Sequence, residues 1–265
     1  MSPSRRKPGG LHPTHEIRHR RAPASDGVPI AYTLWRRPAR ELLILAPGFW
    51  RVRLNRENLF LGEHFLRRGY DVAALDFRGH GDSGGGYAFG AFEHRDFHAV
   101  IDELVGPGKL YDRFAVLGLS LGGSIAAQAL ALRPELPCRA LAMVSSPSDL
   151  SRLRPKPWKA GALRQVRLRH AVRVPRLAAW ALTSRKPRAA ESIASLRMPK
   201  LIVTSEGDWL VDPSHGRELA EQAASPVELV HLELPGSLHA DGLVKFVPLR
   251  LLRVLDRWFE RHAPP

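Results

Sequence analysis

The chain reads Gly118-Leu119-Ser120-Leu121-Gly122-Gly123 directly after an apolar run and directly before a helical stretch rich in alanine. The pattern G-x-S-x-G between a strand and a helix is typical of a sharp turn that exposes a nucleophilic serine. Such a turn is strained and brings the helix close to the strand, so its neighbours must be small. A glycine-rich connection without a chemical role would also look like this. The strand before the turn and the helix after it favour the functional interpretation.

Apolar runs and amphipathic stretches alternate on both sides of this turn. Strands are expected at 30–35, 42–46, 72–77, 114–119, 140–145, 201–205 and 227–232. Helices are expected at 57–68, 92–104, 120–132, 214–223 and 241–261. Near-continuous apolar strands that alternate with helices predict an α/β fold, with a mostly parallel sheet and helices on both of its faces.

One long segment interrupts this alternation. Residues 148–195 contain no convincing strand, and prolines separate helical stretches expected at 163–172 and 176–183. We therefore expect a basic helical cap at 148–195, inserted into one catalytic domain made of residues 14–147 and 196–265. Residues 1–13 are rich in proline, glycine and arginine and are expected to form a disordered tail.

Composition limits the class of protein. The chain has 265 residues, of which 44% are hydrophobic and 25% are charged, which is typical of a globular protein. Its single cysteine, Cys138, excludes an intramolecular disulfide and a cysteine-rich zinc site. No apolar run approaches the roughly 18 residues that span a bilayer, and the basic N-terminus lacks the apolar stretch of a secretory signal. These features predict a soluble, cytoplasmic protein.

The net charge of +14 is concentrated in two places. Residues 1–21 carry +5 and residues 151–190 carry +12, whereas the remainder carries −3. Charge gathered in this way suggests an anionic partner, which could be a membrane surface, an acidic substrate or nucleic acid. A solvated arginine-rich face is an equally good interpretation.

A serine hydroxyl needs a base to remove its proton and an acid to orient that base. Asp208 follows the expected strand 201–205, and His239 follows the expected strand 227–232. Because the carboxyl ends of parallel strands meet at one edge of a sheet, both residues are expected near Ser120. Alone, Asp208 could cap a helix and His239 could stabilise a turn. Their joint placement predicts a catalytic triad of Ser120, Asp208 and His239.

Four stretches resemble the α/β-hydrolase superfamily, and in particular its monoacylglycerol-lipase-like and serine-aminopeptidase-like (S33) branch. They are the serine turn, Ala46-Pro47-Gly48-Phe49, Asp76-Phe77-Arg78-Gly79-His80-Gly81-Asp82-Ser83-Gly84, and Glu206-Gly207-Asp208 with His239. The resemblance runs from about residue 30 to the C-terminus and leaves the tail and the cap unmatched in detail. It agrees with the cap, which this superfamily usually inserts after the sixth strand.

The resemblance implies further site residues. The backbone N–H groups of Phe49 and Leu121 are expected to form an oxyanion hole, although many relatives have His-Gly where this chain has Pro47-Gly48. Some relatives take the acid from the loop after the sixth strand, so Asp149 is the alternative to Asp208. His231 and His80 are expected to be structural. His12, His15 and His19 are weak metal candidates, and we expect no metal and no cofactor.

Serine at this turn predicts acyl transfer, in which water finally releases the acid. We expect a carboxylic ester hydrolase of lipase or esterase type, with a small-molecule acyl ester as substrate. A thioesterase or a peptidase would use the same triad, and a non-catalytic binding protein of this fold is a further alternative. No nucleic-acid-binding module is recognisable, and the sequence does not indicate the oligomeric state.

The cap suggests how the substrate is reached. Its arginines alternate with leucine, valine and tryptophan, and a basic amphipathic stretch of this kind can lie on an anionic membrane. On this hypothesis the protein makes peripheral contact with the membrane and takes lipid-like acyl esters from it. Equal activity on neutral and anionic vesicles would contradict the hypothesis. The alternative is a cap whose apolar side packs on the catalytic domain while its arginines stay solvated.

Overall fold

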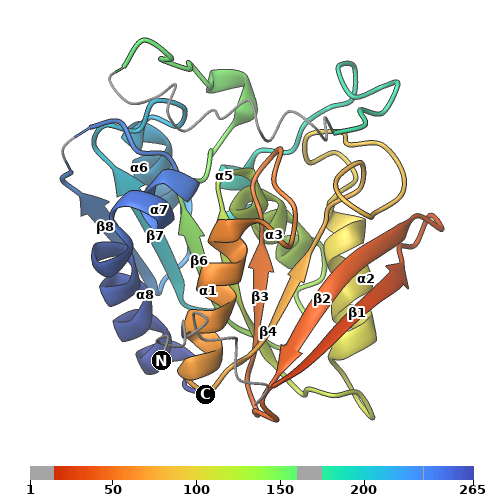
Figure 1. Ribbon diagram of the computed structural model, residues 1–265. Helices are drawn as coiled ribbons and strands as arrows, with labels where there is room; N and C mark the ends of the chain where they lie inside the picture. The colour runs from red at the N-terminus through yellow and green to blue at the C-terminus, as the bar shows by residue number, and fades with distance from the viewer. Residues whose placement is uncertain (1–14, 160–174, 235) are drawn as a thin grey trace, which may run out of the picture.

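The computed structural model describes residues 15–159, 175–234 and 236–265 of the chain. Eight strands form one sheet in the order β1-β2-β4-β3-β5-β6-β7-β8 (Figure 1). The β1–β2 and β2–β4 pairs are antiparallel, and all other neighbours are parallel. The strands are β1 (Glu16–Pro23), β2 (Pro29–Arg36), β3 (Leu42–Ala46), β4 (Asp71–Leu75), β5 (Phe114–Leu119), β6 (Cys138–Val144), β7 (Lys200–Ser205) and β8 (Val227–Leu232).

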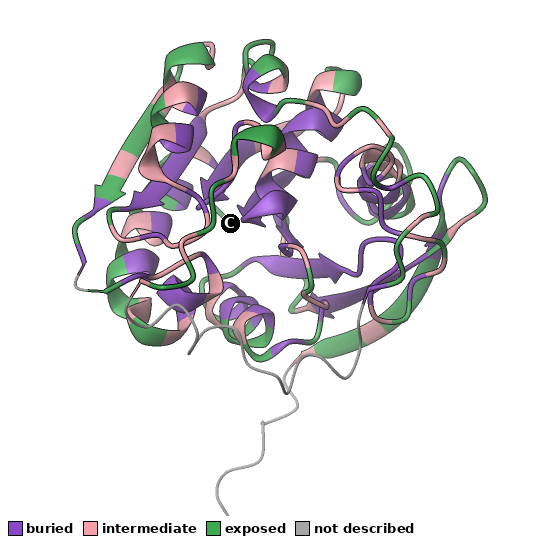
Figure 2. Cartoon of the chain, turned by 90° about the horizontal axis from the view of Figure 1, so that it is seen from above, coloured by how far each residue is buried: buried purple, intermediate pink, exposed green. Residues whose placement is uncertain are grey.

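Helices cover both faces of the sheet. On one face lie α1 (Arg56–Arg67), α7 (Asp241–Phe246) and α8 (Pro248–His262), which pack through buried side chains such as Phe65 and Phe259. On the other lie α2 (His94–Leu104), α3 (Leu121–Leu132), α5 (Ala189–Ile193) and α6 (Pro213–Gln222), packed through Phe97 and Ile125 among others. Figure 2 shows the buried strands between these two layers. The predicted α/β class, with a mostly parallel sheet between helices, is confirmed.

Strand β1 was not expected from the sequence. It pairs with β2 along its whole length, but most of its residues are exposed. An edge strand of this kind carries charged side chains and shows little apolar alternation, so it gives no hydrophobic signal.

Two expected helices differ in the structure. The helix predicted over 241–261 is divided into α7 and α8 at Val247, because Pro248 disfavours helical backbone in the residue before it. The helix predicted over 176–183 is wrong, since these residues form turns and a bridge between Leu177 and Tyr87. That bridge is held by the N–H of Tyr87, which donates to the carbonyl of Arg176 at 2.7 Å, and it fixes the segment to the loop between β4 and α2.

The predicted domain boundaries stay a prediction. The tail at 1–13 and the helix expected at 163–172 lie outside the described residues. The described parts of the expected cap include the short helix η1 (Leu150–Arg152) and α5, and residues 148–159 and 175–188 lie beyond one end of the sheet, at the top of Figure 1. No described helix is long and apolar enough to cross a bilayer.

Candidate active site

Ser120 lies between β5 and α3 in a backbone conformation that serine rarely adopts. Its φ is 52° and its ψ is −129°, and a non-glycine residue in such a region costs about 1–3 kcal/mol. The turn is fixed from the neighbouring strand, because the N–H of Ser120 donates to the carbonyl of Val144 at 2.8 Å. The strain therefore presents the hydroxyl at the carboxyl edge of the sheet, where the side chain is 9% exposed.

Glycines make this turn possible by close packing. A Cβ added to Gly118 would overlap the backbone of Gly123, and one added to Gly122 would overlap the carbonyl oxygen of Ala46. Helix α3 can therefore approach both β5 and the end of β3 only if these positions lack a side chain. This is the steric requirement that the sequence pattern predicted.

The structure brings Ser120, His239 and Asp208 together. The Nε2 atom of His239 lies 2.8 Å from Oγ of Ser120, and its Nδ1 atom lies 2.9 Å from Oδ2 of Asp208. Because a carboxylate only accepts, Nδ1 carries the proton and donates to it, which leaves Nε2 to accept from the serine hydroxyl. Asp208 is 2% exposed, and its Oδ1 accepts from the N–H groups of Leu210 and Val211, both at 2.9 Å.

The alternative acid, Asp149, has other partners. Its Oδ1 accepts from Ser151, where it caps η1, and its Oδ2 lies 3.0 Å from Nε of Arg188.

His231 lies on β8, where its Nδ1 is 2.9 Å from Oγ1 of Thr204, in keeping with the structural role expected of it. His19 lies on β1 against Thr33, and His12 lies outside the described residues. No group of three or more His, Cys, Asp or Glu residues suited to a metal ion occurs in the described ranges.

The loop after β3 lies against the serine turn. A Cβ added to Gly48 would lie 3.0 Å from Cβ of Ser120, so the next residue, Phe49, is also close to Ser120. The Phe49 ring stacks on Tyr87, with 5.3 Å between ring centroids, and packs at 5.0 Å against Phe89. Neither the N–H of Phe49 nor that of Leu121 donates to another group among the described residues. Both donors thus remain available near Ser120.

His80 contacts this loop directly, although the sequence predicted only a structural role for it. The N–H of Trp50 donates to Nε2 of His80 at 3.1 Å, so Nδ1 carries the ring proton and donates to the carbonyl of Arg78 at 3.2 Å. The residue is 3% exposed, and burial lowers the pKa of its imidazole to about 4. His80 is therefore neutral around pH 7.

This buried neutral histidine makes the stability depend on pH. An unfolded histidine has a pKa near 6.5, so the unfolded chain takes up a proton at His80 well before the native state does. The free energy of unfolding should therefore fall as the pH drops from about 6.5 to about 4, by up to about 3 kcal/mol from this residue. Urea denaturation of the wild type and of His80→Gln at pH 7, 6, 5 and 4.5 measures this contribution. A difference between the two proteins that stays constant over this range would contradict it.

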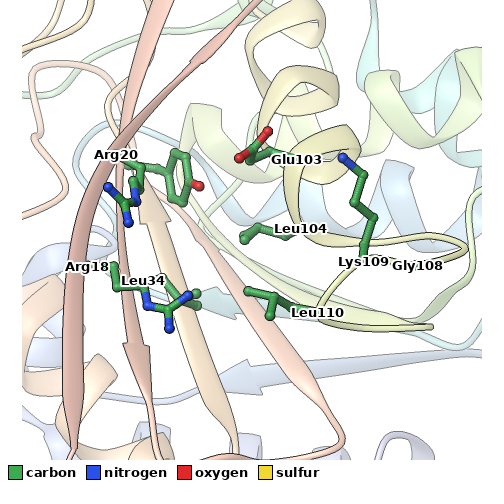
Figure 3. Close-up of a pocket in the computed structure, with 9 residues that line it drawn as sticks. Arg18, Arg20, Leu34, Glu103, Leu104, Gly108, Lys109 and Leu110 are labelled. Atoms are coloured by element: carbon green, nitrogen blue, oxygen red, sulfur yellow. The ribbon is translucent and has the colours of Figure 1, made fainter.

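Two cavities differ in their relation to the triad. A narrow cavity of about 10 Å³ follows α3 from Leu121 to Gln128, and none of the described residues that line it is charged. A larger cleft of about 470 Å³ lies between the β1–β2 pair and the end of α2 (Figure 3). Arg18, Arg20 and Lys109 lie on its walls, but no triad residue does. The first cavity is the one that starts beside the serine turn.

Comparison with known proteins identifies a family and several solved structures that are similar to this chain. The model of a family described as serine aminopeptidase, S33, matches residues 37–187. No curated protein matches the chain.

Solved structures share the whole fold at low sequence identity. The Pyrococcus furiosus esterase Pf2001 is 20% identical, has a TM-score of 0.73, and is matched over 99% of this chain and 97% of its own. The Exiguobacterium antarcticum esterase EaEST is 16% identical, with a TM-score of 0.70 over 91% of this chain and 99% of its own. The esterase RhEst1 from Rhodococcus sp. ECU1013 is 20% identical, with a TM-score of 0.68 over 93% and 99%.

Proposed function

Because the chain belongs to the serine aminopeptidase S33 family of hydrolases, we propose that it cleaves carboxylic esters with Ser120 as its nucleophile. Its fold is that of the α/β-hydrolases, so the resemblance in the sequence is confirmed. One observation carries the proposal. It is the continuous chain of hydrogen bonds from Ser120 through His239 to Asp208, with links of 2.8 and 2.9 Å.

Acylation follows from these contacts. The Oγ atom of Ser120 attacks the ester carbonyl while Nε2 of His239 takes the hydroxyl proton. Asp208 stabilises the imidazolium that forms, and the carbonyl oxygen becomes an oxyanion that accepts from the N–H groups of Phe49 and Leu121. His239 then returns the proton to the leaving alcohol, and the acyl group stays on the serine.

Deacylation uses the same groups. Water replaces the alcohol, His239 removes one of its protons, and the resulting hydroxide attacks the acyl carbonyl. The bond to Ser120 Oγ breaks, the serine regains its proton from His239, and the carboxylic acid leaves. No cofactor is needed for either half of this reaction.

The lining of the cavity along α3 favours an ester over an aminoacyl peptide. An aminopeptidase must bind the positively charged amino end of its substrate, and burying that charge requires an acidic partner. The described residues that line it include no acidic side chain, and Leu121, Ile125 and Phe89 make it largely apolar. A volume of about 10 Å³ holds one water at most, so it is the polarity of this surface, and not its volume, that favours an uncharged acyl group.

A comparison of substrates tests this function. We expect the purified protein to hydrolyse p-nitrophenyl esters and to release no nitroaniline from aminoacyl p-nitroanilides, because the apolar lining does not compensate an ammonium group. Steady-state kinetics across acyl chains from acetate to laurate, with acyl-coenzyme A thioesters alongside, measure the preference.

The outcome separates the alternatives. Faster release from the anilides than from every ester would make the protein a peptidase, and a preference for thioesters would make it a thioesterase. A folded protein that cleaves none of them and does not react with a fluorophosphonate would be a binding protein of this fold.

Peripheral contact with an anionic membrane is proposed for the cap, and a cytoplasmic location stays a prediction. Trp158 is 79% exposed and Leu182 is 88% exposed, which supports contact with an apolar surface. The described cations of the cap are partly used within the protein, since Arg152 and Arg188 both pair with Glu218. Apolar insertion, more than these two charges, would therefore bring the cap to a lipid surface.

A further inference from the structure

The loop that follows β3 is strained next to the proposed oxyanion donor. Trp50 has a φ of 63°, a left-handed conformation that costs a non-glycine residue about 1–2 kcal/mol. A peptide in this conformation persists only where other contacts hold it. Because Trp50 directly follows Phe49, whatever holds Trp50 also limits where the Phe49 N–H can point.

We propose that His80 is a positioning residue for the oxyanion hole, acting through its hydrogen bond from the N–H of Trp50. The inference rests on the proposed function, because it assigns a role within that reaction. The Trp50 nitrogen belongs to the peptide unit that begins at the Phe49 carbonyl. Its bond to Nε2 of His80, at 3.1 Å, therefore fixes the peptide plane next to the donor.

His80 is itself held firmly enough for this task. Its ring is packed between aromatic neighbours, at 4.5 Å from the ring centroid of Tyr87 and 5.8 Å from that of Phe49. Its backbone N–H donates to the carbonyl of Phe77 at 3.0 Å. Arg78, whose carbonyl accepts from Nδ1 of His80, is fixed by Asp96, whose carboxylate accepts from the N–H and the Nε of Arg78 at 2.8 Å.

Other contacts also hold this loop, and one of them closes the turn around the donor, because the N–H of Arg51 donates to the carbonyl of Gly48 at 3.2 Å. Arg51 forms an ion pair with Asp241, and the N–H of Arg53 donates to the buried carboxylate of Asp76 at 2.6 Å. The ion pair is made by a side chain, and the contact of Arg53 lies four residues beyond Phe49. Among the described residues, His80 is the side chain that accepts from the backbone N–H of Trp50, directly after the donor.

Small displacements of such a donor have large effects. An oxyanion donor must lie about 2.7–3.1 Å from the developing charge, and an error of about 1 Å can cost up to about 100-fold in rate. Loss of the Nε2 acceptor should therefore lower kcat by about 10- to 100-fold and leave KM nearly unchanged, since the donor acts on the transition state.

Two amide variants separate positioning from packing. In His80→Gln the side-chain oxygen can occupy the place of Nε2 and accept from Trp50, whereas the shorter His80→Asn places its oxygen near the former Nδ1. We expect His80→Gln to keep kcat within about threefold, while His80→Asn loses about 10- to 100-fold. His98→Ala, which removes a half-buried histidine bonded to the carbonyl of Ala129, should match the wild type.

A second readout reports the oxyanion hole itself. Affinity for an aryl trifluoromethyl ketone, which forms a tetrahedral anion on the serine, should fall in His80→Asn by the same factor as kcat/KM. Equal kcat values for His80→Gln and His80→Asn, or a loss confined to KM, would overturn the proposal. So would unchanged affinity for the ketone in His80→Asn.

Amide exchange distinguishes this inference from the proposed function. Hydrogen–deuterium exchange of the peptide containing residues 49–53 should speed up in His80→Asn and not in His80→Gln, whether or not the protein is an esterase. A wild type without esterase activity would overturn the proposed function. Unchanged exchange in His80→Asn would overturn the role of His80 even in an active enzyme.

Discussion

Replacement of Ser120 by alanine is expected to lower kcat for ester hydrolysis by about 10⁴- to 10⁶-fold and to abolish labelling by a fluorophosphonate probe. The hydroxyl of Ser120 is the group that Nε2 of His239 faces at 2.8 Å, so its removal leaves the base with no nucleophile to activate. Residual hydrolysis would come from water and the oxyanion donors alone. Gel fluorescence after labelling and steady-state kinetics with a p-nitrophenyl ester measure the two effects.

Ser145 offers a matched control. It also follows a parallel strand directly, has a φ of 51°, and is buried, but its hydroxyl has no partner among the described residues. Ser145→Ala should therefore be labelled and active like the wild type. Labelling that survives in Ser120→Ala would place the nucleophile elsewhere, and a folded wild type that is never labelled would contradict serine catalysis.

Replacement of Asp208 by asparagine should lower kcat by about 10⁴-fold. An asparagine that keeps its oxygen toward the N–H groups of Leu210 and Val211 turns its NH₂ group toward His239. The histidine must then accept at Nδ1 and carry its proton on Nε2, which prevents it from taking a proton from Ser120. Steady-state kinetics at neutral pH, with circular dichroism to verify folding, measure the loss.

Asp149→Asn is the comparison that decides between the two acids. This residue caps η1 and pairs with Arg188, so we expect kcat within about threefold of the wild type and a small loss of stability at most. A large loss of kcat in Asp149→Asn together with a small one in Asp208→Asn would reverse the assignment.

The buried strands were predictable because they are almost entirely apolar. The bounds of β3, β5 and β8 are those expected from the sequence, and the other expected strands differ by one or two residues at their ends. Strand β1 was missed because it lies at an edge, where the chain pairs through its backbone and buries few side chains. Hydrophobic periodicity cannot detect such a strand.

The helices depended more on local chemistry. The start of α6 was accessible from the sequence, since Asp212 caps the helix and Pro213 begins it. The break at Val247 was equally readable from Pro248, but the apolar periodicity of the whole segment hid it. Residues 176–183 have helical periodicity, yet the backbone bonds of Arg176 and Ala178 to Tyr87 prevail over it.

One part of the candidate site could be predicted from the sequence and another part could not. Ser120, Asp208 and His239 could be found because each follows a recognisable strand, and parallel strands end at one edge of a sheet. The contact of His80 with Trp50 could not be found, since it joins two irregular loops whose approach depends on their full three-dimensional course. A histidine in a glycine-rich loop carries no signal for the partner of its ring.

The order of Ser120, Asp208 and His239 along the chain has a consequence for biosynthesis. Ser120 and His239 are 119 residues apart, and the histidine follows the last strand of the sheet. A ribosome adds about 5–20 residues per second, so the proposed base is made roughly 6 to 24 s after the proposed nucleophile. A nascent chain whose first strands have already paired thus carries a serine without a base. Under the proposed mechanism, it cannot attack esters around it until β8 has docked and the final loop has closed.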